Sequence, residues 1–142
     1  EAVHTQQSGI PVWEFFKVMK HKKLTLLNMC IVEGSCDFVT SEMLGLNINT
    51  FVHQYGVENA CMLQNDFKKA IQETPFDYKQ WLHNGGQIKN RPADLGYYVG
   101  SEISKGYYEN AKNKRKALKK MLKRGKYKKV YKQSGYGQRA CN

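Results

Sequence analysis

Residues 24–45 read LTLLNMCIVEGSCDFVTSEMLG and form the longest apolar stretch of the chain. Its apolar side chains recur at roughly helical spacing, as at Leu24, Leu27, Ile31 and Phe38. Gly45 is a typical residue just beyond a helix end. The pattern therefore predicts a largely buried helix over residues 24–44. Gly34 and Ser35 are poor helix formers in its middle, and we expect another segment to approach the backbone closely there.

Two carboxylates interrupt this apolar stretch. Glu33 and Asp37 lie about one helical turn apart, so they share a face of the predicted helix. An unpaired carboxylate in apolar surroundings is costly, and a bound cation would remove that cost. We interpret Glu33 as a metal ligand, and Asp37 as the acceptor of the second ring N–H of a ligating histidine. The alternative is a half-exposed polar face of an amphipathic helix. Glu42 is a rival carboxylate, but no aspartate follows it four residues later.

The first residues, EAVHTQQ at 1–7, suggest where such a histidine comes from. One histidine in front would make HEAVH, the zinc-protease motif H-E-x-x-H, in which two histidines one turn apart bind the metal and the glutamate is the general base. Glu1 would be that base and His4 the second histidine ligand, with Glu33 as the third protein ligand. The first histidine is absent from this sequence. As given, the chain is expected to bind zinc poorly and to hydrolyse nothing. The alternative is a solvated helix end.

The remainder of the chain is predicted to be mainly α-helical, with one α-rich domain over residues 1–136 and a tail at 137–142. A connection is expected at 46–56 and a loop at 83–86, and Gly125 is expected to cap the last long helix. The predicted helices and helical turns are 1–8, 12–16, 57–73, 77–82, 91–110, 113–123 and 128–133.

The charge of the chain is concentrated in one segment. The net charge is +11, and residues 112–132 hold 12 of the 23 basic residues and none of the 12 acidic ones. The other 11 basic and 12 acidic residues give −1. Such a segment is typical of a solvated helix face, and the alternatives are contact with nucleic acid or with anionic lipid. No DNA- or RNA-binding motif accompanies it, so no specific nucleic-acid partner is expected.

The sequence contains no run of 18 apolar residues, so no transmembrane segment is expected, and no targeting segment is recognised. Four cysteines form no C-x-x-C pair. We expect free thiols, mostly buried, and no disulfide framework. The four are Cys30, Cys36, Cys61 and Cys141.

Five blocks of the chain resemble the predicted zinc-dependent protease family, which is similar to the gliding-motility B lipoproteins of Bacteroidetes. The resemblance covers about residues 1–136 and is most specific at EGSCDF and RPADLGYYVG. The blocks are EAVHTQQ (1–7), IVEGSCDF (31–38), WLHNG (81–85), RPADLGYYVG (91–100) and YYENAKNKRKAL (107–118).

This resemblance implies a gluzincin-type zinc metallopeptidase fold, of which this chain would be the C-terminal helical part. It implies Zn²⁺ as cofactor, a protein or peptide substrate, and the bacterial cell envelope rather than the cytoplasm. Carried over by position, Glu1 falls on the general base, His4 and Glu33 on zinc ligands, and Asp37 on the residue behind the metal ligands. A non-catalytic cell-envelope interaction domain with the same fold is the alternative.

A zinc peptidase also needs a hydrogen-bond donor for the oxyanion that forms at the attacked carbonyl. Tyr97 and Tyr98 are the catalytic candidates, and since neighbours on a helix point about 100° apart, we expect one of them to face the site and favour Tyr98. Aromatic packing in the core is the alternative for each. Arg91 and His83 are further candidates by chemistry. For Arg91 we favour a structural pairing with a carboxylate, and Asp94 is expected to make a structural or substrate contact.

Overall fold

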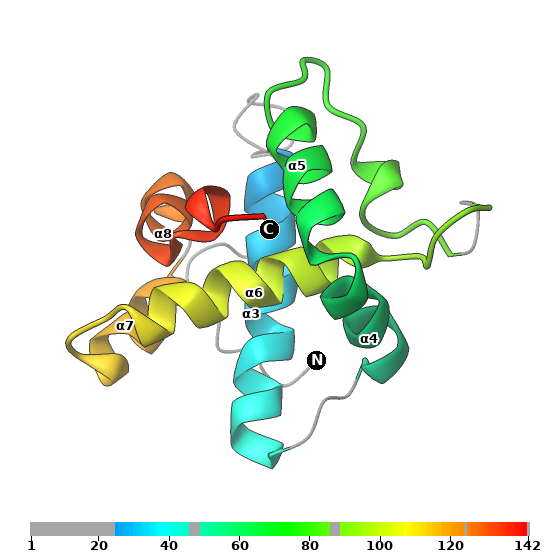
Figure 1. The fold of residues 1–142 in the computed structure, drawn as a ribbon. Helices are drawn as coiled ribbons and strands as arrows, with labels where there is room; N and C mark the ends of the chain where they lie inside the picture. The colour runs from blue at the N-terminus through cyan, green and yellow to red at the C-terminus, as the bar shows by residue number, and fades with distance from the viewer. Residues whose placement is uncertain (1–24, 46–48, 86–88, 124, 142) are drawn as a thin grey trace, which may run out of the picture.

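The computed structural model describes residues 25–45, 49–85, 89–123 and 125–141. Within those ranges the chain is helical and contains no β-strand, so the prediction of a mainly α fold is confirmed. The helical turns expected at 1–8 and 12–16 lie outside the described residues. The helices are α3 (Leu26–Leu44), α4 (Thr50–Glu58), α5 (Ala60–Ala70), α6 (Leu95–Glu109), α7 (Lys114–Met121) and α8 (Tyr127–Ser134), with short 3₁₀ turns at Tyr78–Gln80 and Tyr136–Gln138 (Figure 1).

The predicted central helix is α3, and both of its ends carry caps. The Thr25 hydroxyl accepts a hydrogen bond from the Asn28 N–H at 3.3 Å, which satisfies a backbone donor of the first turn. Gly45 adopts φ 66° and donates its N–H to the Ser41 carbonyl at 2.8 Å. Most of the residues from Leu26 to Phe38 are buried. The prediction of a largely buried helix that ends before Gly45 is therefore confirmed, and the helix begins at Leu26, two residues later than predicted.

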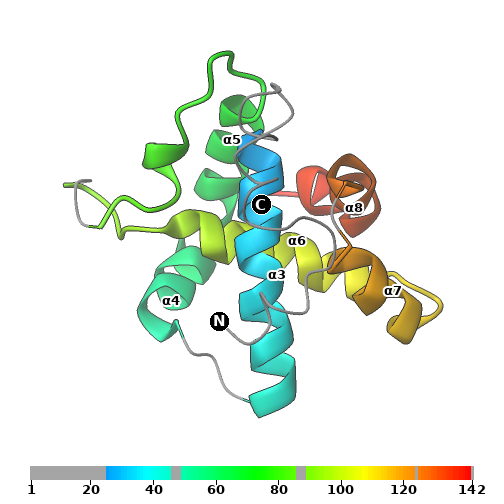
Figure 2. The same ribbon diagram turned by 180° about the vertical axis from the view of Figure 1, so that it is seen from behind.

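Helix α6 is the segment that approaches the middle of α3. The two helices cross, with α6 in front of α3 in one view and behind it in the opposite view (Figures 1 and 2). A Cβ atom on Gly34 would overlap the backbone of Gly100 and Ser101, and a Cβ atom on Gly100 would overlap the Cys30 carbonyl. The crossing therefore requires glycine on both helices, as the position of Gly34 predicted.

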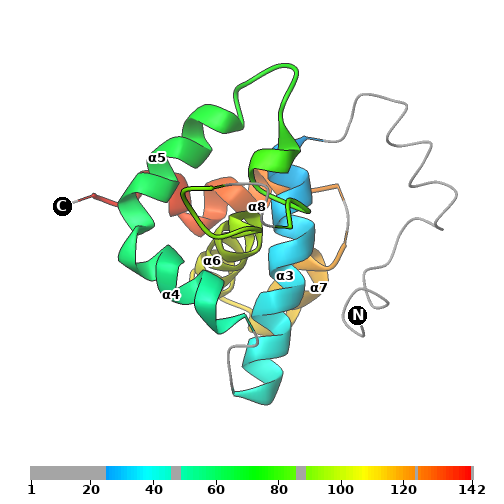
Figure 3. The ribbon, with the colours of Figure 1, turned by 90° about the vertical axis from the view of Figure 1, so that its right-hand side faces the viewer.

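The segment expected as a connection at 46–56 is helical at its end. Helix α4 begins at Thr50 and ends at Glu58, and α5 begins at Ala60. The single helix predicted over 57–73 is therefore wrong at its N-terminal end, where residues 57 and 58 belong to α4. The break falls at Asn59, whose side-chain amide donates to the Tyr55 carbonyl at 2.9 Å. In the side view α6 lies between α3 and the α4–α5 pair (Figure 3).

The C-terminal helices differ from the prediction in their ends. Helix α7 ends at Met121 with Leu122 as its C-cap, so Gly125 lies in a later turn with φ 105° and does not cap it. The short turn expected at 128–133 is the two-turn helix α8, which ends at Ser134 and is capped by Gly135 with φ 69°. Val130 and Ser134 of α8 are buried, because this helix packs on α6.

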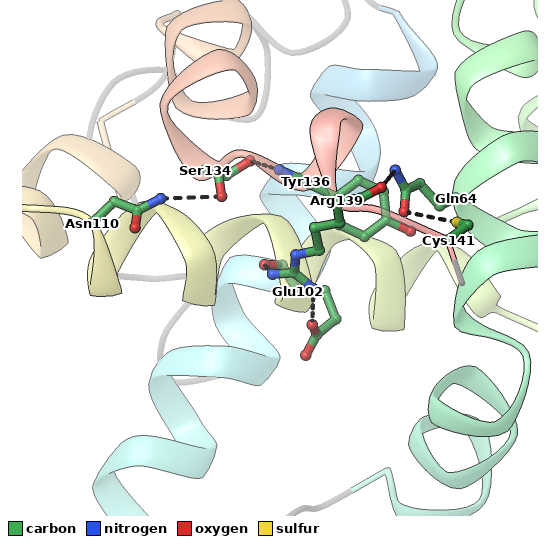
Figure 4. A network of polar contacts seen from close by, with 7 residues as sticks. All are labelled: Gln64, Glu102, Asn110, Ser134, Tyr136, Arg139 and Cys141. Atoms are coloured by element: carbon green, nitrogen blue, oxygen red, sulfur yellow. Dashed lines mark hydrogen bonds and ion pairs between the residues drawn. The ribbon is translucent and has the colours of Figure 1, made fainter.

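The C-terminal tail is tied to α5 and α6 (Figure 4). The Arg139 guanidinium pairs with the Glu102 carboxylate at 2.6 Å, and the Gln64 amide donates to the Arg139 carbonyl at 3.1 Å. A disulfide joins Cys61 to Cys141. The expectation of four free thiols is thus wrong for this pair, which lies 80 residues apart in sequence, whereas Cys30 and Cys36 are buried thiols outside any disulfide.

The apolar core fills the space between α3, α5 and α6, with Phe67 at its centre. The Phe67 ring makes edge-to-face contacts with Trp81, at 5.2 Å between ring centroids, and with Tyr136, at 6.4 Å. All three side chains are at most 3 % exposed. None of the described helices is both long enough and apolar enough to cross a bilayer.

Candidate functional site

Glu33 of α3 meets Tyr97 in the first turn of α6, next to the glycine crossing. Both side chains are half-buried. Burial raises the pKa of Tyr97 above its ordinary value, and the Glu33 charge and a side-chain hydrogen bond to Glu33 raise this pKa further. The direction of these effects means that the Tyr97 hydroxyl stays protonated and donates a hydrogen bond to the Glu33 carboxylate.

The position of Tyr97 depends on how α6 begins. Asp94 is the N-cap with φ 61°, a left-handed conformation that non-glycine residues seldom adopt. The Asp94 N–H donates to the Asn84 side chain at 2.9 Å, and the Asn84 N–H donates to the Asp94 carboxylate at 3.2 Å. This reciprocal pair fastens the loop before α6 to its first turn. The loop also carries His83, whose ring lies edge-on to Tyr97 with 6.4 Å between centroids. Asp94 therefore has a structural contact.

Asp37, one turn after Glu33, faces His53 of α4. Asp37 Oδ2 and His53 Nε2 lie 3.6 Å apart, and the two side chains are only 11 % and 14 % exposed. Both atoms are buried, and neither has a hydrogen-bond partner among the described residues. At this distance the pair is an ion pair when the histidine is protonated, but it is too long for a hydrogen bond. A buried carboxylate oxygen with unused bonding capacity thus lies next to Glu33.

Tyr98 points away from Glu33. Its ring covers Gly56 of α4, where a Cβ atom would overlap it. The same ring lies edge-on to His53, with 5.5 Å between centroids. Burial, and to a lesser degree the Glu102 charge, raise the pKa of Tyr98 to about 12. Of the two adjacent tyrosines, Tyr97 makes the hydrogen bond to Glu33. Tyr98 packs against the ring of His53, the histidine that faces Asp37.

Arg91 binds the loop before α6. Its guanidinium donates to the Gln80 carbonyl and lies over the Trp81 ring, 4.7 Å from the ring centroid. Among the described residues these contacts are to a carbonyl and an aromatic face, and not to the carboxylate that we expected. The contacts hold the loop that carries His83 and Asn84.

The predicted site residues fall into three groups. Glu33, Asp37 and Tyr97 lie together at the crossing of α3 and α6, whereas Tyr98, Arg91 and Asp94 lie around it as packing and loop contacts. Glu1 and His4 lie outside the described residues. Within the described ranges, no group of three or more His, Cys, Asp or Glu side chains could hold a metal ion. The described residues therefore fit zinc only as one part of a site. Glu33 supplies a carboxylate there, and Asp37 has an unbonded buried oxygen that suits a partner for a ligating histidine.

His53 is the site residue that sequence analysis did not identify. It follows Val52 and precedes Gly56, and these two residues form the buried face of α4. A helix prediction at 50–58 would have placed His53 beside that buried face. The segment was instead expected to be a connection, so its histidine received no role.

Comparison with known proteins gives one result. The family model described as predicted Zn-dependent protease (DUF2268) matches residues 12–124 of the chain, a range that contains Glu33, Asp37, His53 and Tyr97. No curated protein and no solved structure gives a significant match. Because the match covers well over half of the 142 residues, the chain belongs to this family of predicted Zn-dependent proteases.

Proposed function

We propose that the chain carries the glutamate ligand and its supporting residues in a zinc-dependent peptidase of the gluzincin type. Glu33 is the carboxylate ligand in this proposal, His4 is the second histidine ligand, and Glu1 is the general base. The observation that carries the proposal is the position of Glu33. Its side chain is half-buried, accepts a hydrogen bond from Tyr97 and lies one helical turn before Asp37. Membership of a predicted Zn-dependent protease family supports it at the level of the reaction class.

In this proposal each site residue has a separate role in peptide hydrolysis. Bound Zn²⁺ supplies a Lewis acid and lowers the pKa of a water molecule. Glu1 accepts a proton from the attacking water at its carboxylate and later delivers it to the leaving amine. Tyr97 holds the Glu33 carboxylate in one orientation through its hydroxyl, since the raised pKa keeps that hydroxyl protonated. Asp37 accepts a ring N–H of a ligating histidine and fixes its tautomer.

The resemblance to the gliding-motility B lipoproteins of Bacteroidetes supports an assignment of this activity to the bacterial cell envelope. Protein or peptide substrates follow from the reaction class.

Hydrolysis of a library of quenched fluorescent peptides tests the proposal. The chain is expressed with one histidine added before Glu1, which completes the H-E-x-x-H motif. Glu1→Gln should abolish hydrolysis while bound zinc is retained, because the amide keeps the shape of the base but cannot accept the proton. Glu42→Gln is the matched control, since Glu42 is exposed at the end of α3. Hydrolysis that survives Glu1→Gln would rule out the assigned base. Zinc binding without hydrolysis in the parent would favour the non-catalytic interaction domain.

A further inference from the structure

A pocket of about 450 Å³ opens at the other end of α6 from Glu33 and Tyr97. Its floor includes the buried residues Tyr107 and Ala117, and its rim is formed by the end of α6, by α7 and by α8. The three helices gather at this end of the molecule (Figure 1). Tyr97 and Tyr107 are separated by about 15 Å along the helix, so the pocket is distinct from the candidate zinc site.

Three lysines line this pocket, namely Lys112, Lys116 and Lys120. Lys116 and Lys120 lie one turn apart on α7 and share a side of that helix, and Lys112 lies in the turn between α6 and α7, two residues before α7 begins. None of the three has a carboxylate partner among the described residues. The segment 112–132 contains no acidic residue that could neutralise them. Three lysines therefore line one concave surface, and no acidic side chain among the described residues pairs with them.

Lys114 has a different role from these three lysines. Its ammonium donates to the carbonyls of Tyr108 and Glu109 at 2.8 and 2.7 Å, and lies 5.0 Å from the centre of the Tyr108 ring. It therefore closes the C-terminal end of α6. A lysine with this structural role does not line the pocket, whereas the three lysines that do line it have no such role.

The remaining polar groups of the pocket are side-chain amides. The Asn110 amide donates to the carbonyls of Gln133 and Ser134 at 3.1 and 3.3 Å, which fixes α8 against the end of α6. The Asn113 side-chain oxygen accepts from the Lys116 N–H at 2.8 Å as the N-cap of α7, so its amide N–H₂ remains as a donor. The first turn of α7, with the positive end of its dipole, borders the same space.

We propose that this pocket binds the phosphate group of a phosphorylated ligand. Lysine binds phosphate as a compact point charge. Three lysines and the Asn113 amide in one pocket therefore suit an anion of high charge with several acceptor oxygens. The phosphate belongs either to a soluble phosphate compound or to a phosphomonoester lipid headgroup, two sources with the same chemistry. The volume leaves room for more than the phosphate, and Tyr107 offers an aromatic surface for the rest of the ligand.

The test measures binding of two probes by the full 142-residue chain. Pyrophosphate, followed by titration calorimetry, represents the soluble source. Phosphatidylcholine vesicles that contain phosphatidic acid, followed by co-sedimentation, represent the lipid source. The pocket variant combines Lys112→Gln, Lys116→Gln and Lys120→Gln. The control combines Lys119→Gln, Lys123→Gln and Lys128→Gln, which removes the same charge from exposed positions of the same segment outside the pocket. Circular dichroism verifies that each variant is folded.

The proposal expects binding of at least one probe by the parent chain. The pocket variant should lose about tenfold or more in affinity, and the control should lose much less. The single change Lys116→Gln should produce a smaller loss in the same direction, which preserves the test if the triple variant is misfolded. Absence of binding to both probes would overturn the proposal. Equal losses in the two triple variants would also overturn it, because they would indicate diffuse attraction to any polyanion, including DNA.

Discussion

The side chain of Asp37 connects the candidate zinc site to the rest of the fold. On one side it shares a helix face with Glu33, and on the other it faces His53 across 3.6 Å. The Tyr98 ring packs edge-to-face against the His53 ring and helps to hold it in place. The carboxylate is therefore positioned before any ligand arrives, and within the part of the chain that the structure describes its buried Oδ2 has no hydrogen-bond partner.

We expect Asp37→Asn to weaken zinc binding by about tenfold to a hundredfold in the chain with a histidine added before Glu1. The amide would accept a weaker hydrogen bond from a ligating histidine and would lose the carboxylate charge. Competition with a chelator of known affinity measures the change. Glu73→Gln, at an exposed position after α5, is the control for the loss of one negative charge. Unchanged zinc affinity in Asp37→Asn would remove Asp37 from the site.

Tyr136 and Tyr98 make stability depend on alkaline pH. Burial raises the pKa of Tyr136, and it raises the pKa of Tyr98 to about 12. In an unfolded chain tyrosine ionises near pH ~10, so above that pH the unfolded state releases protons that the native state retains. The stability from these groups is complete below pH ~10 and falls as pH rises toward their native pKa values, by about 1.4 kcal/mol per pH unit for each tyrosine.

Tyr136→Phe should therefore reduce the loss of stability between pH 9 and pH 11. At pH 7 the change should be neutral or slightly stabilising, because the buried Tyr136 hydroxyl has no hydrogen-bond partner in the described ranges. Urea unfolding at the three pH values measures both effects. A variant as sensitive to alkaline pH as the parent would mean that other groups cause the loss. A large loss of stability at pH 7 would mean that the hydroxyl is bonded in solution.

At the level of elements, the crossing of α3 and α6 positions Glu33 against Tyr97. An alanine at an open helical site would be about 1 kcal/mol more favourable than glycine. At Gly34 and Gly100 we expect the opposite sign, a destabilisation of about 3 kcal/mol or more, because the added methyl group would overlap backbone atoms that cannot move independently. Urea unfolding of Gly34→Ala and Gly100→Ala measures this. Stabilisation by either substitution would show that the helices do not touch there.

The sequence predicted elements where local pattern and packing agree. Helix α3 has a long apolar run, a capping Thr25 and a terminal Gly45, so its bounds were nearly correct. Helix α4 was missed because two of its apolar side chains, Phe51 and Val57, are 72 % and 68 % exposed, and no helical stripe was visible. Packing of Val52 and Gly56 against the rest of the fold determines this helix, and that information is absent from a local pattern.

In the candidate site, too, local pattern predicts some features and tertiary packing determines others. The pairing of Glu33 with Asp37 follows from their spacing on one helix and could be predicted. The choice between Tyr97 and Tyr98 depends on how α6 rotates against α3, and this rotation is set by the contact between Gly34 and Gly100 and by the loop pair of Asn84 and Asp94. These contacts cannot be read from the sequence, and we therefore favoured Tyr98 as the residue that faces Glu33.

At the level of the whole molecule, the bond between Cys61 and Cys141 closes most of the chain into one loop. Closing a loop of this length restricts the unfolded chain, and we expect reduction to lower the free energy of unfolding by about 2–4 kcal/mol. Urea unfolding with and without a reductant measures the difference, and Cys61→Ser should reproduce it. Peptide mapping without reduction identifies the bonded pair. Four reactive thiols in the oxidised, unfolded chain would contradict the bond.

The central claim is that Glu33 is a zinc ligand in a peptidase-type site that includes His4. The most direct test is the zinc content of the purified chain with one histidine added before Glu1, measured by elemental analysis beside the same chain carrying Glu33→Ala or the control Glu42→Gln. We predict about one zinc per chain in the parent and in the control, and almost none in Glu33→Ala. A folded parent without zinc, or a Glu33→Ala variant that retains the metal, would contradict the claim.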